Sequence, residues 1–519
     1  MIMNTTNTTS AMNATNTTNA ASAMNTTNTT DTTDTNIVQD LDEMTKAVTK
    51  AVTKEMTEET ASSSVASTVK ENKITEGVIW QQLLIFFFPI LFGTFFQQLY
   101  NAADAIIVGQ FVGKEALSAV GGGTAGIIQL LVGFFVGISS GATVIISQYY
   151  GAKRPEMVGY AVHTAVAFSI VAGFLLMIGG IAAAPAMLKA MDTPADVLGP
   201  SVTYIRIYFA GVIGNLLYNM GAGILRAVGD SKRPLYFLIA SCLTNIVLDV
   251  VLVMGLKMGV AGAALATILA QALSAVLVVA VLMRTDDMHH LDFRRIGIDK
   301  RMFNRIIRIG LPAGLSSVMY SSSNVIVQSG VNSLGTDTVA AWTAYGKIDC
   351  IFWMIISAFG IAITTFVGQN YGAGKYERVR KGIRVCMGMS AATTVLISVL
   401  LYFFGVHFYG LFTSDTAVVE IGIGVLRYLV PTYITYITIE ILSGGLRGVG
   451  DCWMPTVISC LGVCVLRISW IMFAVPMRRD IYTIAFCYPL TWTVTSILYI
   501  IYYLFFSKMK VVGNKCLKE

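Results

Sequence analysis

The sequence predicts an all-α integral membrane protein, with twelve transmembrane helices arranged as two pseudo-symmetric six-helix lobes. The chain has 519 residues, of which 55% are hydrophobic and 13% charged, and its mean hydropathy is +0.67. Apolar stretches such as Leu235–Met254 and Gly259–Met283 are long enough, at about 1.5 Å per residue, to cross a hydrocarbon core of about 30 Å. One such stretch could be a buried core helix, but twelve in series indicate a membrane protein.

The expected spans fall into two sets of six. The first set covers residues 80–109, 116–149, 157–187, 198–226, 234–254 and 259–284. The second set covers residues 302–333, 336–369, 376–408, 419–447, 455–475 and 482–506. Several of these segments exceed the length needed to cross a bilayer, so we expect tilted or kinked helices.

The second set repeats motifs of the first at a constant distance. Gly223–Asp230 (GILRAVGD) matches Gly444–Asp451 (GGLRGVGD), and Gln148–Ala152 (QYYGA) matches Gln369–Ala373 (QNYGA), each 221 residues later. The repeat predicts two lobes of similar structure. Membrane transporters with internal repeats place the substrate path between the repeats, so we interpret the chain as a transporter.

The domain organisation follows from the spans. We expect a disordered, Asn/Thr-rich cytoplasmic tail over residues 1–76, because its Asn-Thr-Thr repeats cannot form a core. The first lobe covers 77–284, a cytoplasmic loop 285–301, the second lobe 302–506 and a cytoplasmic tail 507–519.

Positive charges predict the orientation. With both termini in the cytoplasm, the inward loops, the span ends next to them and the C-terminal tail hold 22 of the 36 Lys and Arg residues. The outward loops then hold only Lys114, Lys189, Lys257, Arg478 and Arg479. This asymmetry favours a multi-pass protein of a bacterial-type plasma membrane with both termini inside. The basic inter-lobe loop therefore sets topology, and we expect no nucleic-acid partner.

Several other classes of site are not indicated. None of the eight cysteines has CxxC spacing, so neither a zinc site nor a disulfide framework is predicted. No glycine series follows a strand, which argues against a phosphate-binding loop and an ATPase. We expect a non-enzymatic protein without a cofactor, working as a monomer in the lipid bilayer.

Ionisable residues inside the spans are the candidates for mechanism, because a charge in the bilayer is costly and is normally functional or paired. Away from the charged ends of the spans, we count four internal acids and four internal bases, and their equal numbers indicate that some acids neutralise bases. The acids are Asp104, Asp249, Asp349 and Glu440, and the bases are Arg206, Lys347, Arg427 and Arg467.

Asp104 and Asp249 differ from the other acids because the first lobe has few bases. Asn245 lies one helical turn before Asp249, and Thr267 in the sixth span offers a hydroxyl oxygen. Two carboxylates, an amide oxygen and a hydroxyl suit Na⁺, and the same carboxylates could instead share a proton. Pro89 predicts a bend in the helix that carries Asp104. The alternative is that the acids only make buried hydrogen bonds between helices.

The second lobe does not repeat these acids. Asn324 stands near the place of Asp104, and the 221-residue offset puts Leu466 and Trp470 where the first lobe has its Asn-x-x-x-Asp pair. The acids therefore serve a task performed once per molecule. Glu440, Asp349 and Lys347 form a possible secondary ionisable site.

The repeated Leu-Arg-x-x-Gly-Asp motifs predict tight cytoplasmic turns. Their charged residues, which we expect to brace the ends of the lobes, are Arg226, Asp230, Arg447 and Asp451.

The chain resembles the multidrug and toxic compound extrusion (MATE) transporters over residues 80–506. The resemblance rests on the two Gln-x-Tyr-Gly-Ala loops, the two Leu-Arg-x-x-Gly-Asp loops and four further motifs. These four are Val108-Gly109, Leu117–Gly121, Gly262–Thr267 and Gly310–Ala313.

The resemblance implies two six-helix bundles in a V shape that extrude organic cations against inward Na⁺ or H⁺. In the DinF-like branch it implies a first-lobe cation site, here at Asp104, Asn245, Asp249 and Thr267. The other branch uses an acid in the seventh span, and span 302–333 has none.

We therefore expect secondary active antiport of lipophilic, cationic small molecules by alternating access. One alternative is a flippase for a lipid-linked precursor, which would favour a broad cationic cleft and extra spans. A receptor or membrane enzyme would need an effector domain or a polar catalytic cluster, and neither is evident in the sequence.

Overall fold

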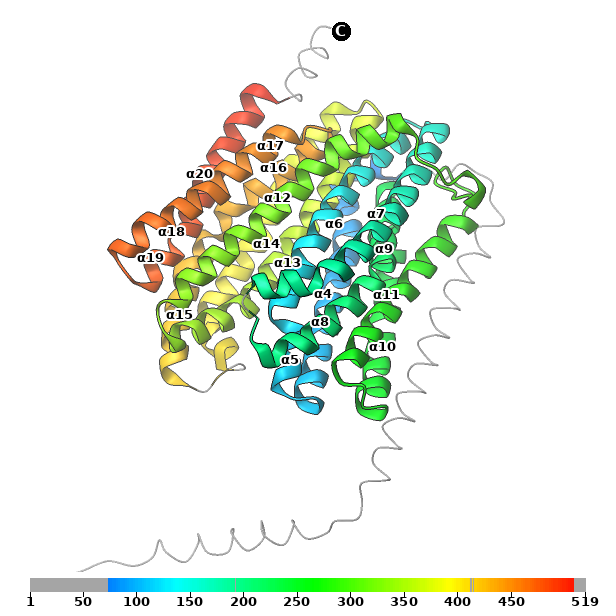
Figure 1. Ribbon diagram of the computed structural model, residues 1–519. Helices are drawn as coiled ribbons and strands as arrows, with labels where there is room; N and C mark the ends of the chain where they lie inside the picture. Colours follow the sequence, from blue (N-terminus) through cyan, green and yellow to red (C-terminus); the bar gives the residue numbers. More distant parts are fainter. Residues whose placement is uncertain (1–72, 192, 411–412, 414, 508–519) are drawn as a thin grey trace, which may run out of the picture. The chain divides into compact units, whose positions relative to one another are not determined.

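The computed structural model describes residues 73–191, 193–410, 413 and 415–507, and it contains only helices in this part of the chain (Figure 1). The first lobe, called the N-lobe, contains α4 to α11. Its helices, with the short α3 before them, are α3 Lys73–Glu76, α4 Ile79–Phe111, α5 Lys114–Gly121, α6 Gly123–Gly151, α7 Pro155–Ala190, α8 Ala195–Ala210, α9 Val212–Val228, α10 Lys232–Asp249, the π-helical η1 Val250–Gly255 and α11 Gly259–Arg284.

The second lobe, called the C-lobe, begins after the short 3₁₀ turn η2 Phe293–Arg295. Its helices are α12 Lys300–Asn332, α13 Thr336–Gly372, α14 Tyr376–Gly410, α15 Thr416–Leu429, η3 Val430–Thr432, α16 Tyr433–Gly448, α17 Trp453–Ser459, the π-helical η4 Cys460–Val465, α18 Leu466–Met477, α19 Ile481–Ala485, α20 Cys487–Ile501 and η5 Tyr502–Phe506.

Each predicted span corresponds to one helix or to a short series of helices. Within the described residues, ten helical segments are long and apolar enough to cross a membrane, and the pair α8 and α9, bent by 48°, makes an eleventh. The bend falls at Gly211, where a Cβ atom would lie 2.4 Å from Ile268 Cβ. A side chain at this position would separate α8 and α9 from α11.

The remaining predicted span is α12, which has 33 residues but is less apolar than the others. Its N-terminal turns carry basic residues, and a run of serines interrupts its middle. Because α12 packs along α6 of the other lobe, part of its surface faces protein rather than lipid. The fold class predicted from the sequence is confirmed, and the polar composition of α12 reflects its place between the lobes.

The lipid-facing flanks carry large apolar side chains that a water-soluble protein would bury. Leu175 is 66% exposed, Phe403 69% and Phe473 73%. Exposed apolar surface on this scale indicates a hydrocarbon environment. The helices therefore present the apolar residues, which give the chain its high hydropathy, to the bilayer.

The internal repeat is visible in the backbone of the loops. The amide of Asp230 donates to the carbonyl of Leu225, and that of Asp451 donates to the carbonyl of Leu446, both at 2.9 Å. The glycine before each Asp has a positive φ, 110° at Gly229 and 79° at Gly450. Each motif thus ends its helix in a left-handed turn, whose amides donate hydrogen bonds to the last carbonyl groups of the helix. These are the tight turns that the sequence predicts.

Glycines bring the two lobes into close contact along α6 and α12. A Cβ atom on Gly137 would lie 2.4 Å from Gly314 Cα, and one on Gly141 would lie 2.4 Å from the Ile306 carbonyl oxygen. Small residues at a helix crossing allow the backbones to touch. The glycine series of α6 therefore sets the spacing between the lobes.

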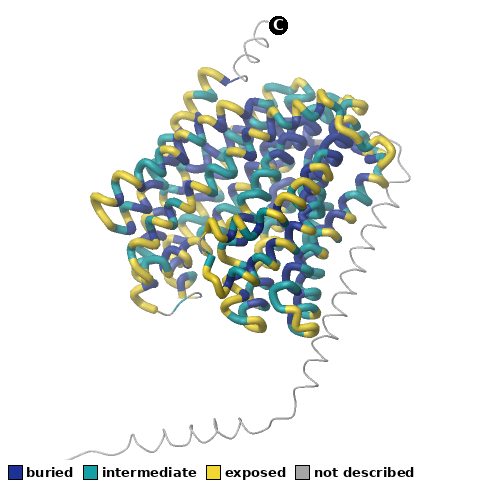
Figure 2. The backbone as a smooth tube through the Cα atoms, viewed as in Figure 1, coloured by how far each residue is buried: buried dark blue, intermediate teal, exposed yellow. Residues whose placement is uncertain are grey.

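Burial along the lobe interface changes from one end to the other. Residues 141–147 of α6 and 362–370 of α13 are all buried, whereas only Thr124 and Ile127 are buried between 121 and 137. Figure 2 colours the backbone by this burial. The lobes are therefore packed together at the end near residues 148–151 and 369–372, which we call the closed end. The opposite half of α6 is mostly half-buried or exposed.

Residues before α4 also pack at this end. Ile74 is buried, and its carbonyl oxygen accepts hydrogen bonds from the Arg378 guanidinium. Lys375 Nζ donates to the Thr75 carbonyl at 3.0 Å. Residues 73–76, the last four of the predicted disordered tail, are therefore helical and packed on the C-lobe. Residues 1–72 and 508–519 of the predicted tails lie outside the described part.

Candidate functional site

The N-lobe gathers the four polar residues that the sequence singles out. Asp104 lies on α4, Asn245 and Asp249 lie on α10, and Thr267 lies on α11. Asp104 is 6% exposed, Thr267 2%, and Asn245 and Asp249 are fully buried. Because α10 packs against both α4 and α11, the three helices bring these side chains into one buried region.

The two carboxyl groups lie close enough to influence each other's charge. Both Asp249 oxygens and both polar atoms of the Asn245 amide are buried without a hydrogen-bond partner among the described residues. Thr267 donates to the Ala263 carbonyl at 3.0 Å, which leaves its oxygen lone pairs available. The site therefore contains carboxylate and amide oxygens without hydrogen-bond donors. No basic side chain among the described residues contacts them.

A π-helical segment, η1, begins directly after Asp249. A π-turn widens the helix and shifts its carbonyl register, and such turns occur frequently at functional sites. Here the change follows the residue that interacts with Asp104. The irregular backbone of η1 thus directly follows the buried, unpaired Asp249 of α10.

Three tyrosines and a glutamine, absent from the sequence prediction, surround the carboxylates. Tyr204 interacts with Asp104 and Thr267, and Tyr100 interacts with Asp104 and Gln271. Tyr208 also contacts Gln271. The signal that could have found them is helical spacing: Tyr100 precedes Asp104 by one turn, Gln271 follows Thr267 by one turn, and Tyr204 and Tyr208 are a turn apart.

This arrangement suits one small cation. Carboxylate, amide and hydroxyl oxygens are hard ligands, and two carboxylates in an apolar region bind a cation or share a proton to reduce their repulsion. The geometry brings the four predicted residues together. Their role in ion coupling stays a prediction.

The C-lobe acids have partners of a different kind. Asp349 accepts hydrogen bonds from Trp353 Nε1 at 2.6 Å and from the Tyr433 hydroxyl. Glu440 Oε1 lies 3.8 Å from Arg447 Nη2. Lys347 is exposed and forms no ion pair with Asp349 among the described residues. The possible secondary site is therefore two separately satisfied acids rather than one cluster.

The expectation that acids within spans neutralise the listed bases is wrong for the described residues. No ion pair there joins Arg206, Lys347, Arg427 or Arg467 to one of the four acids. Glu440 pairs instead with Arg447 of the repeated motif, about two turns further along the same helix, α16. Equal numbers of charges could not reveal which side chains meet, because pairing depends on helix packing.

The repeated motifs meet each other at the closed end. Gln148 Nε2 of the N-lobe donates to the Gly448 carbonyl of the C-lobe at 2.8 Å. Gln369 Nε2 of the C-lobe donates to the Ala227 carbonyl of the N-lobe at 2.6 Å. Donors and acceptors are related by the same 221-residue offset. Each lobe therefore holds the Leu-Arg-x-x-Gly-Asp loop of the other through a reciprocal hydrogen bond.

Comparison with known proteins decides the family. The MatE family model matches the chain twice, over residues 89–251 and 312–472, so each match falls in one lobe. The chain belongs to the MatE family. It is thus a transporter and not an enzyme.

Several proteins are similar to this MatE protein. One is the probable multidrug resistance protein YoeA of Bacillus subtilis strain 168, 29% identical over 85% of this chain and 97% of that protein. Another is the multidrug export protein MepA of Staphylococcus aureus strain MRSA252, 21% identical over 76% of this chain and 88% of that protein.

The fold is also similar to a solved structure described as the outward-facing conformation of a multidrug resistance MATE family transporter of the MOP superfamily. The TM-score is 0.80, with 21% identity, and the match covers 86% of this chain and 100% of that chain. At this identity, the likeness supports the fold alone.

The charged residues of the MatE protein's loops hold the ends of helices. Asp230 accepts from the amides of Lys232 and Arg233 and lies 3.4 Å from Arg233 Nε. Asp451 accepts from the Tyr502 hydroxyl at 2.7 Å. Arg226 is half-buried beside Tyr218. These contacts fasten the turns to neighbouring helices.

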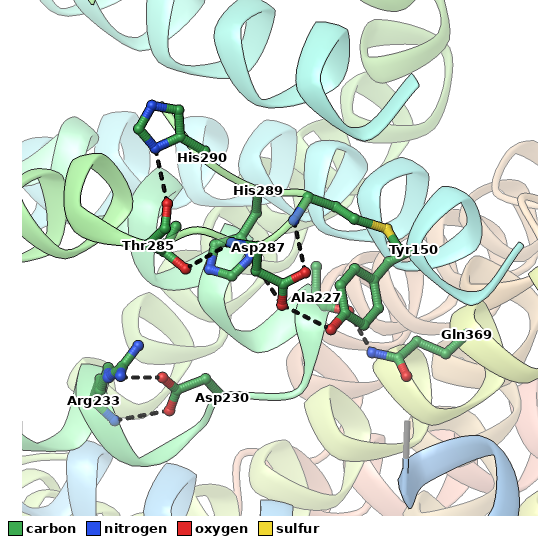
Figure 3. A network of polar contacts seen from close by, with 10 residues as sticks. Tyr150, Ala227, Asp230, Arg233, Thr285, Asp287, His289, His290 and Gln369 are labelled. Carbon is green, nitrogen blue, oxygen red and sulfur yellow. Dashed lines mark hydrogen bonds and ion pairs between the residues drawn. The ribbon is translucent and has the colours of Figure 1, made fainter. Parts of the chain in front are cut away.

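The inter-lobe loop lies beside these turns (Figure 3). Tyr150 donates from its hydroxyl to Asp287 Oδ2 at 3.0 Å, and His289 Nδ1 lies 3.6 Å from the same oxygen. His289 is buried, and the loss of solvation lowers its pKa to about 4 despite the nearby Asp287 carboxylate. The imidazole is therefore neutral at pH 7.

Pro89 lies inside α4, which continues as a helix on both sides of it. Proline cannot donate to the carbonyl four residues earlier, that of Ile85. Ser231, in the N-lobe loop, donates its hydroxyl to this carbonyl oxygen at 3.4 Å. The loop thus supplies a donor to the Ile85 carbonyl, which Pro89 leaves without its helical hydrogen bond. Whether the helix bends there in function stays a prediction.

Proposed function

We propose that this MatE protein exports lipophilic organic cations and couples their export to inward flow of Na⁺ or H⁺. The relatives named as multidrug resistance and multidrug export proteins support the substrate class. One observation supports the coupling: Asp104 and Asp249 are buried close together, with no basic partner among the described residues. A bound Na⁺ or proton offsets one of the two negative charges and so relieves their repulsion, and its release restores that repulsion.

The reciprocal contacts of Gln148 and Gln369 support alternating access as the transport mechanism. They hold one end of the lobe interface closed, whereas the other half of α6 is mostly half-buried or exposed. The positive charges of the neighbouring loops favour a cytoplasmic place for the closed end. In this conformation the substrate is released to the outside, and breaking both contacts opens the opposite side.

Efflux of a fluorescent lipophilic cation from proteoliposomes tests the proposal. A Na⁺ gradient and a pH gradient are imposed separately on the wild type, on Asp249→Asn and on Asp349→Asn. We expect one gradient to drive transport in the wild type and in Asp349→Asn but not in Asp249→Asn. Full transport by Asp249→Asn would show that the N-lobe pair does not couple.

Failure of the wild type under both gradients would contradict cation antiport. The flippase alternative would then be tested in the same vesicles, with a fluorescent lipid and a membrane-impermeant quencher. A lipid moved by the wild type but not by empty vesicles would establish that alternative.

A further inference from the structure

The centre of the C-lobe contains a buried arginine that the proposed transport cycle does not use. Arg467 lies on α18, directly after the π-helical η4, and its side chain is fully buried. The 221-residue offset relates it to Ile246, beside Asn245 in the N-lobe. Where the N-lobe carries its acids, the C-lobe therefore carries a positive charge.

The guanidinium has few polar partners. Nη1 donates to Asn324 Oδ1 at 3.0 Å, while Nε and Nη2 have no acceptor among the described residues. No Asp or Glu in this part of the chain forms an ion pair with Arg467 or is among the groups that influence its charge. Guanidinium stays protonated in proteins, so the charge is not lost by deprotonation.

Two aromatic rings cover the guanidinium. The Arg467 Cζ atom lies 4.4 Å from the centroid of the Tyr488 ring and 5.5 Å from that of Tyr320. Cation–π contacts offset part of the loss of solvation, but ring faces do not accept the in-plane N–H groups. The two unpartnered donors therefore remain after the rings are counted.

Further donors point to the same region. Trp492 is 1% exposed, and its indole N–H has no acceptor among the described residues. The Tyr320 hydroxyl interacts with Tyr436, Arg467 and Trp492 but makes no hydrogen bond of good geometry. A buried cation and two neutral donors near one another form the complement of an anion.

The site lies just below the surface of the C-lobe. Asn324 is exposed, and Tyr320 and Tyr488 are partly exposed. All three contact the guanidinium of Arg467, so they lie between it and the surface.

We propose that the C-lobe binds a small monovalent anion at Arg467. The anion accepts hydrogen bonds from Arg467 Nε and Nη2, from the Tyr320 hydroxyl and from Trp492 Nε1. The shared chemistry is that of chloride and of a carboxylate group on an organic ligand. This inference does not depend on transport or on the identity of the coupling ion.

The test uses the full-length protein, purified in detergent, and follows its thermal unfolding. Sodium chloride and sodium benzoate are titrated separately, and sodium isethionate keeps the ionic strength constant. A ligand that binds only the folded state raises the melting temperature with a saturable dependence on concentration. We expect this rise in the wild type for at least one of the two anions.

The two anions identify the source of the ligand. A rise with chloride alone indicates an inorganic ion, whereas a rise with benzoate that chloride reduces indicates a carboxylate at the same site. Absence of a saturable rise with either anion would overturn the proposal and leave Arg467 a purely structural residue.

Variants locate the effect. Arg467→Met should lose the anion-dependent rise, because it removes the charge and both donors. Arg427→Met is the matched control: Arg427 also lies over a tyrosine ring, that of Tyr402 at 5.7 Å, but it is exposed. It should respond as the wild type does. An unchanged anion response in Arg467→Met would overturn the proposed site.

Asn324→Asp keeps the test decisive if Arg467→Met does not fold. It changes one atom and places a carboxylate at the 3.0 Å contact with Nη1, thereby supplying the anion within the chain. We expect a higher melting temperature without added anion and no further rise with it. A wild-type anion response in Asn324→Asp would count against the site.

Discussion

The two lobes share their turns and helix order but differ in charge at their centres. The N-lobe buries Asp104 close to Asp249, whereas the C-lobe buries Arg467 near the corresponding place, where it donates to the exposed Asn324. The loop hydrogen bonds at Asp230 and Asp451 have the same length in both lobes. The two lobes thus share their loop geometry, because each lobe needs the same turn for its helices to pack. Their central polar residues differ, because the charged centres serve different tasks.

Removing the N-lobe acid should have the largest effect on this comparison. Asp249→Asn removes one charge of the pair, so gradient-driven efflux should fall by about a hundredfold or more, as for loss of a group essential to the cycle. Asp349→Asn in the C-lobe, whose carboxylate is satisfied by Trp353 and Tyr433, should retain most of the activity. Equal loss in both variants would remove the functional distinction between the lobes.

Separating the lobes should have the next largest effect. Gly137→Ala places a Cβ atom 2.4 Å from Gly314 Cα, so the variant should unfold about 1–3 kcal/mol more easily, the usual cost of overpacking. Gly159→Ala is the matched control, since nothing lies within 4 Å of its Cβ position. Thermal unfolding in detergent should show a lower melting temperature for Gly137→Ala and no decrease for Gly159→Ala.

The reciprocal glutamine contacts test the remaining symmetry. Gln148→Met and Gln369→Met each remove one hydrogen bond of about 1 kcal/mol, which shifts the closed-end equilibrium by about fivefold. The two variants should act equally. Spin labels at the exposed residues Glu115 and Asp337, in a variant without native cysteines, report the distance distribution between the lobes.

A shift in only one glutamine variant would show that the closed end is held by one lobe. A shift in both would extend the symmetry of the loops to the conformational change. The unsubstituted glutamines in the same labelled background provide the reference.

The inter-lobe loop should give the smallest effect and has no counterpart in the C-lobe. Burial lowers the pKa of His289 to about 4, below the ordinary value of 6.5. Between these values the unfolded chain binds more protons than the folded one, so stability falls as pH decreases from about 6.5 to 4. The melting temperature of His289→Gln should decrease less over this range than that of the wild type. Parallel curves would contradict the assignment.

The sequence alone determined the twelve-span organisation, the repeat and the four polar residues of the N-lobe. Hydropathy and length are local properties, and a constant offset between motifs can be read without coordinates. Asp104 and Asp249 stood out because an acid in an apolar span is costly wherever the helix packs.

Only the tertiary structure decided which charges meet. The sequence contains as many internal bases as acids, yet Glu440 pairs with Arg447 while Arg467 has no acid partner among the described residues. The tyrosines around Asp104 and the reciprocal contacts of Gln148 and Gln369 likewise join distant helices. Side-chain partners depend on the rotation and crossing of packed helices, which hydropathy does not specify. Only the fold therefore shows that the N-lobe has a negatively charged centre and the C-lobe a positively charged one.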